Sequence, residues 1–291
     1  MEFHLFLPQM RLSPEALRAR AEAAEAAGFT GLAVMDHLFP PRAADQPMYE
    51  ALTTVTWLAA VTERLRLGHL VLCDSFRHPA VLARQAVTLD HLSGGRFELG
   101  IGSGSTPEEL ATYGFPATTG AQRVERLAET LALLRGFWSG EPVHHQGANF
   151  SVDGARQLPT PLGPLPIVIG GTGPKTMALV AEYADWWNVP IHQTDRLASA
   201  RPASGGARVS VQLLITFITD ERERDDVEAL ALRRFGGMST EGRLVGNAAE
   251  LLPRLRALEA GGVERIYTWF TDFAPPGTLE AFGREVIDAW A

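Results

Sequence analysis

Strand-like and helix-like segments alternate along most of this chain, and that alternation limits the fold more than any other feature. Short apolar runs with strand character recur eight times, and nearly all of them are followed by a helical pattern. We expect the strands at residues 3–7, 31–35, 65–72, 96–101, 166–169, 186–189, 209–218 and 263–270.

Eight such units predict an α/β fold of the (β/α)8 TIM barrel type. A doubly wound open sheet is the alternative, but the first strand is not followed by the Gly-x-Gly-x-x-Gly pattern of that fold. No composition shift or linker marks a domain boundary. We therefore expect a single barrel domain over residues 1–291, with small insertions.

The expected helices have recognisable ends. Ser13 and Pro14 begin a helix that Gly28 ends, because serine caps the first amides, proline suits the first helical position and glycine stops the last turn. Two segments depart from the repeat: residues 146–152 have the pattern of a small hairpin, and residues 192–208 of a shortened, mobile loop. Further helices are expected at residues 50–62, 79–91, 121–138, 175–184, 221–235, 248–260 and 278–290.

Charge and composition exclude several classes of function. The 291 residues carry a net charge of −8, which argues against nucleic acid or an anionic membrane as a partner. The single cysteine, Cys73, excludes an internal disulfide, and the histidines lack the spacing of metal ligands, so no metal site is expected. The sequence has no signal-peptide pattern and no run of about 18 apolar residues. We expect a cytoplasmic protein.

Three polar or glycine-rich turns follow strands of the predicted barrel. They are Asp36-His37 after the second strand, Gly102-Ser103-Gly104 after the fourth, and residues 170–173 after the fifth. Such loops let the backbone approach a ligand closely and present N–H groups to it. Because the carboxyl ends of barrel strands meet at one face, the sequence predicts one large ligand there.

Seven short motifs are spread over essentially the whole chain, at residues 24–29, 35–37, 67–71, 76–79, 92–96, 100–104 and 169–171. As a set they resemble the bacterial luciferase-like superfamily of flavin and deazaflavin oxidoreductases. The similarity is strongest to its coenzyme F420-dependent branch. The resemblance implies a (β/α)8 barrel of the bacterial luciferase-like type that holds the cofactor at the carboxyl ends of its strands.

The resemblance also implies roles for individual residues. It places Asp36 and His37 at the cofactor, with His37 catalytic, and it places a bulge with a non-proline cis peptide at Leu70–Val71 behind the cofactor ring, with Cys73 nearby. The remaining cofactor contacts fall on Gly102, Ser103, Gly104, Glu108, Gly170, Gly171, Thr172 and Gly173. The Thr172 hydroxyl and the following helix N-terminus favour an anion.

The hydride-transfer reaction that the resemblance implies also needs one positioned proton. Histidine titrates near neutrality, which suits His37 for supplying or orienting that proton. Glu50, at the start of a helix near the expected mouth of the site, is the second catalytic candidate. Ser105 stands where relatives that oxidise sugar phosphates have an acid, and their substrate-phosphate lysines have no clear match.

We therefore expect an F420-dependent oxidoreductase that transfers a hydride between the cofactor and a small organic substrate, acting as a reductase with reduced F420. An FMN-dependent luciferase-like monooxygenase is one alternative. A non-catalytic cofactor-binding protein of the same fold is another. A homodimer is expected from the resemblance.

Overall fold

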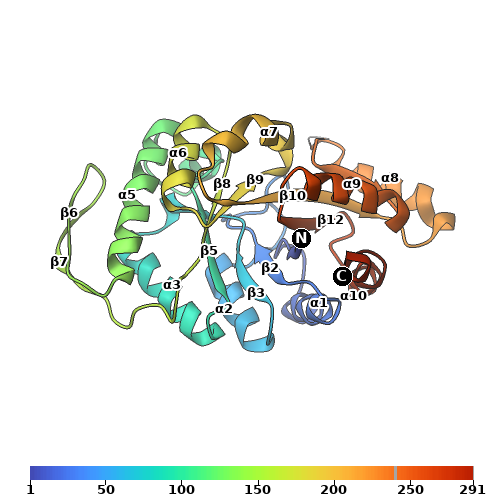
Figure 1. The fold of residues 1–291 in the computed structure, drawn as a ribbon, viewed down its shortest axis with the longest axis horizontal. Helices are drawn as coiled ribbons and strands as arrows, with labels where there is room; N and C mark the ends of the chain where they lie inside the picture. The colour runs from blue at the N-terminus through green and yellow to red at the C-terminus, as the bar shows by residue number, and fades with distance from the viewer. Residues whose placement is uncertain (239–240, 291) are drawn as a thin grey trace.

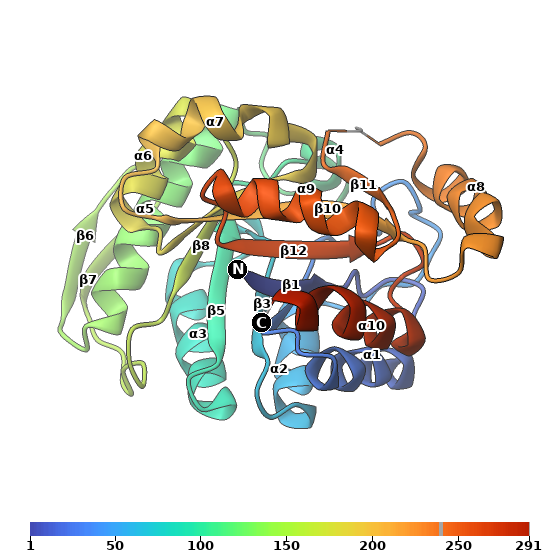
Figure 2. The ribbon, with the colours of Figure 1, turned by 45° about the vertical axis from the view of Figure 1, so that its right-hand side comes forward.

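The computed structural model describes residues 1–238 and 241–290, and it contains the predicted barrel (Figures 1 and 2). Its ring closes because β12 pairs with β1 and β9 pairs with β10, all in parallel. The fold prediction is therefore confirmed, and the open-sheet alternative is wrong. Residues 239, 240 and 291 of the expected domain lie outside the described residues. The ring strands are β1 (Glu2–Phe6), β2 (Gly31–Val34), β3 (Arg66–His69), β5 (Phe97–Gly102), β8 (Ile167–Gly170), β9 (Trp186–Val189), β10 (Arg208–Phe217) and β12 (Arg265–Phe270).

Helices surround this ring, and their ends follow local signals. Ser13 caps the first helix by accepting a hydrogen bond from the amide of Ala16 at 3.2 Å. Gly94 ends the third helix in the left-handed conformation, with φ of 65°. The longer helices are α1 (Pro14–Ala26), α2 (Ala51–Val61), α3 (Pro79–Ser93), α5 (Gly120–Trp138), α6 (Pro174–Tyr183), α8 (Arg224–Phe235) and α9 (Ala248–Ala260). The expected hairpin is β6 (Val143–Gln146) with β7 (Ser151–Ala155), which lies outside α5 in Figure 1.

The third predicted strand is interrupted, as the resemblance implied. β3 is followed by β4 (Leu72–Cys73), and the Leu70–Val71 peptide between them is cis. β3 pairs Gly68 with Glu98, whereas β4 pairs Leu72 with Ile101, so one extra residue is accommodated in a bulge. Gly100 faces this bulge. A Cβ atom there would lie 1.8 Å from the carbonyl oxygen of His69, so only glycine fits.

The structure corrects the prediction of a loop at residues 192–208. Residues 191–203 form three short helices: η2 (Ile191–Arg196), α7 (Leu197–Ala200) and η3 (Arg201–Ala203). Each has too few residues to show an apolar stripe with a 3.6-residue period, so the sequence pattern did not reveal them. Further elements that were not predicted are η1 (Asp74–Phe76), α4 (Pro107–Thr112) and β11 (Arg243–Gly246), which pairs with β10. The last predicted helix is α10 (Pro276–Phe282) followed by a π-helical and a 3₁₀ turn.

Charged residues fill the barrel at the amino ends of its strands. Arg265 on β12 is 1% exposed and donates to both carboxylate oxygens of Glu98, at 2.6 and 3.0 Å, and to Glu2 at 2.8 Å. Its guanidinium lies 3.7 Å from the centre of the Trp186 ring. Above this layer, His4 packs edge-on against Tyr267. The amino end is thus filled by side chains, which leaves the carboxyl end for a ligand.

A buried histidine stands at the end of β3. His69 is 1% exposed, and among the described residues neither of its ring nitrogens has a hydrogen-bond partner. Burial lowers its pKa to about 4, because the positive charge cannot be solvated there. His69 is therefore neutral in the folded protein near neutral pH.

We expect the free energy of unfolding to fall as the pH drops from about 6.5 to about 4. In that range the unfolded chain binds a proton at His69 that the folded protein does not, so acid favours the unfolded state. His69→Leu should remove about 2–3 kcal/mol of this loss. Urea unfolding of both proteins at about pH 7 and about pH 4.5 measures it. An equal loss in the two proteins would contradict the prediction.

Candidate functional site

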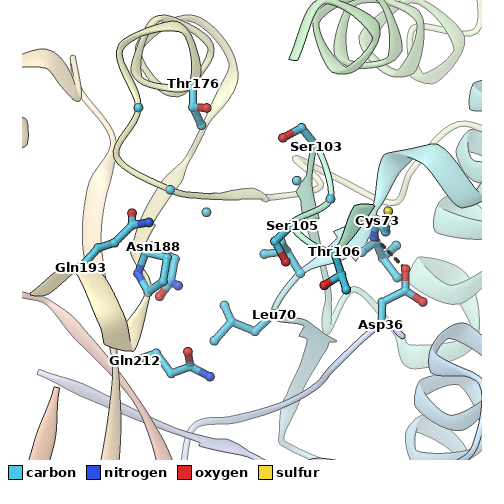
Figure 3. A pocket seen from close by; sticks show the side chains of 18 of the residues that line it. Asp36, Leu70, Cys73, Ser103, Ser105, Thr106, Thr176, Asn188, Gln193 and Gln212 are labelled. Carbon is cyan, nitrogen blue, oxygen red and sulfur yellow. Dashed lines mark hydrogen bonds between the residues drawn. The ribbon is translucent and has the colours of Figure 1, made fainter. Parts of the chain in front are cut away.

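A cavity of about 470 Å³ opens at the carboxyl ends of the barrel strands (Figure 3). It is bounded by the turn after β2, the bulge between β3 and β4, the loops after β5 and β8, and the inner sides of β9 and β10. Most of the residues predicted from the sequence meet here. They are Asp36, His37, Leu70, Val71, Cys73, Gly102, Ser103, Gly104, Gly170, Gly171, Thr172 and Gly173.

Asp36 is held in an ion pair. Its carboxylate accepts hydrogen bonds from Arg77 at 2.5 and 2.9 Å, and from the backbone amide of Cys73 at 2.7 Å. The bidentate pairing with Arg77 balances the charge of Asp36, and the hydrogen bond from the Cys73 amide ties the turn after β2 to β4. Burial raises the pKa of the Cys73 thiol to about 11, so the thiol is neutral at physiological pH and is no nucleophile. Asp36 and Cys73 are therefore suited to shaping the wall of the cavity.

His37 is paired with a carboxylate that the sequence analysis did not select. Glu109 on α4 is 3% exposed, and its carboxylate lies 2.8 Å from Nδ1 of His37 and 2.5 Å from the amide nitrogen of Leu38. Burial alone would raise the pKa of Glu109, but the hydrogen bonds from His37 and the Leu38 amide lower it. An ionised carboxylate can only accept, so Nδ1 carries the proton and Nε2 remains for a ligand.

The two other predicted carboxylates, Glu108 and Glu50, do not line this cavity. Glu108 is exposed and does not line the cavity. Successive helix residues point in directions about 100° apart, and on α4 it is the Glu109 side chain that points inward. Glu50 caps α2 by accepting from the amide of Thr53 at 2.7 Å, and it pairs with Arg77 at 2.9 Å. It is half exposed and lies outside the cavity lining.

The glycine loops allow the backbone to form the cavity wall. A Cβ on Gly102 would lie 2.8 Å from Val71, and one on Gly104 would lie 2.8 Å from the Cys73 sulfur. Gly171 has φ of 123°, a conformation that side chains rarely adopt. The loop that follows leads into α6, whose first turn contributes Thr176 to the lining. Exposed backbone and a helix N-terminus together suit an anionic group of a ligand.

Several lining residues were missed by the sequence analysis. Asn188 and Gln212 are buried on β9 and β10, and both face the cavity (Figure 3). A polar residue within an otherwise apolar strand was the available signal for each. The segment after β9 supplies four more, which are Pro190, His192, Gln193 and Arg196.

The described residues contain no group of three or more His, Cys, Asp or Glu side chains placed to hold a metal ion. Within residues 1–238 and 241–290, no helix combines the length and apolar character needed to cross a bilayer.

Two curated relatives are F420-dependent glucose-6-phosphate dehydrogenases. The enzyme of Beutenbergia cavernae is 36% identical over 176 residues, which is 60% of this chain and 52% of that enzyme. The enzyme of Nakamurella multipartita is 32% identical over 244 residues, 77% of this chain and 71% of that enzyme. The match thus spans about half of the first relative and more than two thirds of the second.

The fold is shared with solved structures. An F420-dependent secondary alcohol dehydrogenase, solved with an F420–acetone adduct, superposes with a TM-score of 0.83 at 18% identity and covers 98% of both chains. A family model described as luciferase-like monooxygenase matches residues 1–272. The chain therefore belongs to the luciferase-like monooxygenase family.

Proposed function

We propose that this protein is an F420-dependent oxidoreductase that transfers a hydride between the deazaflavin cofactor and a small organic substrate, acting as a reductase. One observation carries the proposal: a single cavity joins the His37–Glu109 pair, the bulge at Leu70–Val71 and the two glycine loops. The names of the curated relatives described above support the choice of F420 over other cofactors.

The residues present fit such a cofactor. Side chains at Gly102 and Gly104 would fill the space beside Val71 and Cys73, so the glycines leave a cradle for a planar ring. Leu70 and Val71 would lie against one face of that ring. The phosphate of the cofactor tail would meet the loop from Gly171 to Gly173 and the start of α6, where backbone amides favour an anion.

When bound, F420 supplies a two-electron hydride carrier with carbon in place of the flavin N5. The chain's own residues hold the proton that is transferred along with the hydride. Glu109 holds the Nδ1 proton of His37, so the doubly protonated ring would donate its Nε2 proton to the substrate in the reductive direction, and the neutral ring would accept a proton at Nε2 in the reverse direction. Asp36, neutralised by Arg77, keeps the turn that carries His37 in place. Ser105 lines the cavity but cannot act as a strong acid, so it does not replace His37 as the group that transfers the proton.

The affinity for F420 is expected to exceed that for FMN. The two ligands share a tricyclic ring framework but differ in the atom at position 5 of the ring and in their tails, and the relatives named above use F420. Fluorescence quenching of each ligand by the purified protein gives both dissociation constants. FMN binding at least about tenfold tighter, about 1.4 kcal/mol, would favour an FMN-dependent monooxygenase instead. Failure to bind either ligand would contradict both the proposal and the two alternatives that bind a cofactor.

We also infer a cytoplasmic homodimer that acts on a small molecule and binds neither nucleic acid nor membranes. The net charge of −8 supports the absence of polyanionic partners. The homodimer rests on the resemblance to the superfamily. Light scattering of the purified chain tests it, and a monomer at working concentration would contradict it.

A further inference from the structure

Two buried amides form the wall of the cavity across the barrel from His37. Asn188 on β9 is 3% exposed and Gln212 on β10 is 9% exposed. β9 and β10 lie on the opposite side of the closed ring from β2, whose end carries Asp36 and His37. Figure 3 shows the two amides on one side of the view, Asp36 and Cys73 on the other, and Leu70 between them.

The hydrogen-bonding capacity of this amide pair is largely unused. The Oδ1 atom of Asn188 accepts from the Ser210 hydroxyl at 3.1 Å, which directs its Nδ2 group away from that contact. Among the described residues, neither Nδ2 of Asn188 nor either polar atom of Gln212 has a hydrogen-bond partner, although both residues line the cavity. The two side chains are buried as a whole, but these free polar atoms open onto a ligand-sized space, where a ligand can satisfy them.

The surroundings of the amide pair favour an uncharged group. Asp36 is neutralised by Arg77, and Glu109 is paired with His37, so neither carboxylate presents a free charge to the cavity. The amides themselves carry no charge, but they offer N–H donors and, in Gln212, a carbonyl acceptor. The amides offer no positive charge to a carboxylate or phosphate, for which the cavity lining offers Arg196 on η2 instead. A carbonyl, hydroxyl or carboxamide would be satisfied.

We propose that Asn188 and Gln212 form the substrate-recognition site and that the substrate presents an uncharged carbonyl, hydroxyl or carboxamide group to them. The assignment to the substrate rests on the proposed function, which places the cofactor ring against the bulge on the other side of the cavity. The pyrimidinedione edge of a deazaflavin has the same donor and acceptor chemistry, so a test must separate the two ligands.

The test uses matched probes and a matched substitution. Cyclohexanecarboxamide and cyclohexanecarboxylate have nearly the same shape but differ in charge. Gln212→Met replaces the amide by an apolar side chain of similar length, and Asn188→Leu does the same on β9. Dissociation constants for both probes are measured by ligand-observed NMR with the cofactor present, and the constant for F420 is measured by fluorescence quenching in each protein.

The wild type should bind the carboxamide more tightly than the carboxylate. Each substitution should weaken carboxamide binding by about fivefold, the loss expected for one or two neutral hydrogen bonds, while F420 binding changes less than about twofold. Equal carboxamide binding in wild type and variants would overturn the proposal, as would a preference for the carboxylate. Weakened F420 binding with unchanged probe binding would assign the amides to the cofactor.

These outcomes are separable from a failure of the proposed function. If the wild type binds FMN in place of F420, the same probes and variants are measured with FMN present. The carboxamide preference and its loss in Gln212→Met would then still support the recognition site. Circular dichroism of the variants at the assay temperature confirms that they are folded.

Discussion

Replacement of Arg265 by leucine is expected to lower the free energy of unfolding by about 3–5 kcal/mol. Arg265 is almost completely buried and is the shared partner of Glu98 and Glu2. Burial alone would raise the pKa of Glu98, but the adjacent Arg265 lowers it, so Glu98 is ionised. Without the guanidinium, that charge would be left inside the barrel, and among the described residues Arg66 at its edge would be the remaining ion-pair partner. Equilibrium unfolding in urea at neutral pH measures the loss.

The control for this prediction is Arg208→Leu. Arg208 also pairs with Glu2, and it pairs with Glu264, but its side chain is about half exposed. Solvent screens such pairs, so the loss should be at most about 1 kcal/mol. A double variant, Arg265→Leu with Glu98→Leu, should regain stability relative to Arg265→Leu alone, because it leaves no unpaired charge at Glu98. Equal losses in Arg265→Leu and Arg208→Leu would show that the buried cluster has no special role.

The barrel could be predicted from sequence because its signals are local. The helix at residues 248–260 matches the prediction in full, since Asn247 and Glu250 form a capping box at its start. The strand at residues 186–189 matches as well. The bulge at Leu70–Val71 came from the resemblance, because no local propensity predicts a cis peptide before a residue other than proline.

The missed features depend on contacts between distant segments. Two adjacent glutamates, Glu108 and Glu109, have the same chemistry, and only the orientation of α4 decides which one reaches His37. From the sequence alone, an arginine at a strand end is expected to be exposed. Arg265 is buried because it pairs with Glu98, 167 residues away along the chain. Gln212 became a site candidate only once the closed barrel placed it across from Asp36.

His37 is expected to carry the proton transfer, and its loss should lower turnover by about 10²–10⁴-fold, or about 3–5 kcal/mol of barrier. His37 lines the cavity at the end of β2, and Glu109 holds its ring through Nδ1. His37→Ala removes the proton carrier but not the glycine loops, so F420 affinity should stay within several-fold. Single-turnover oxidation of bound, reduced F420 by a substrate measures the chemical step without product release.

Two further variants identify how His37 acts. His37→Asn keeps a hydrogen-bonding group but cannot transfer a proton near neutral pH, so partial recovery of the rate would assign His37 to orientation. Glu109→Gln should lower the rate by roughly tenfold or more, because an amide can donate to Nδ1 as well as accept from it and no longer enforces one tautomer. Glu50→Gln should leave the rate nearly unchanged, since Glu50 lies outside the cavity and pairs with Arg77. If Glu50→Gln abolishes turnover while His37→Ala does not, the proton belongs to Glu50.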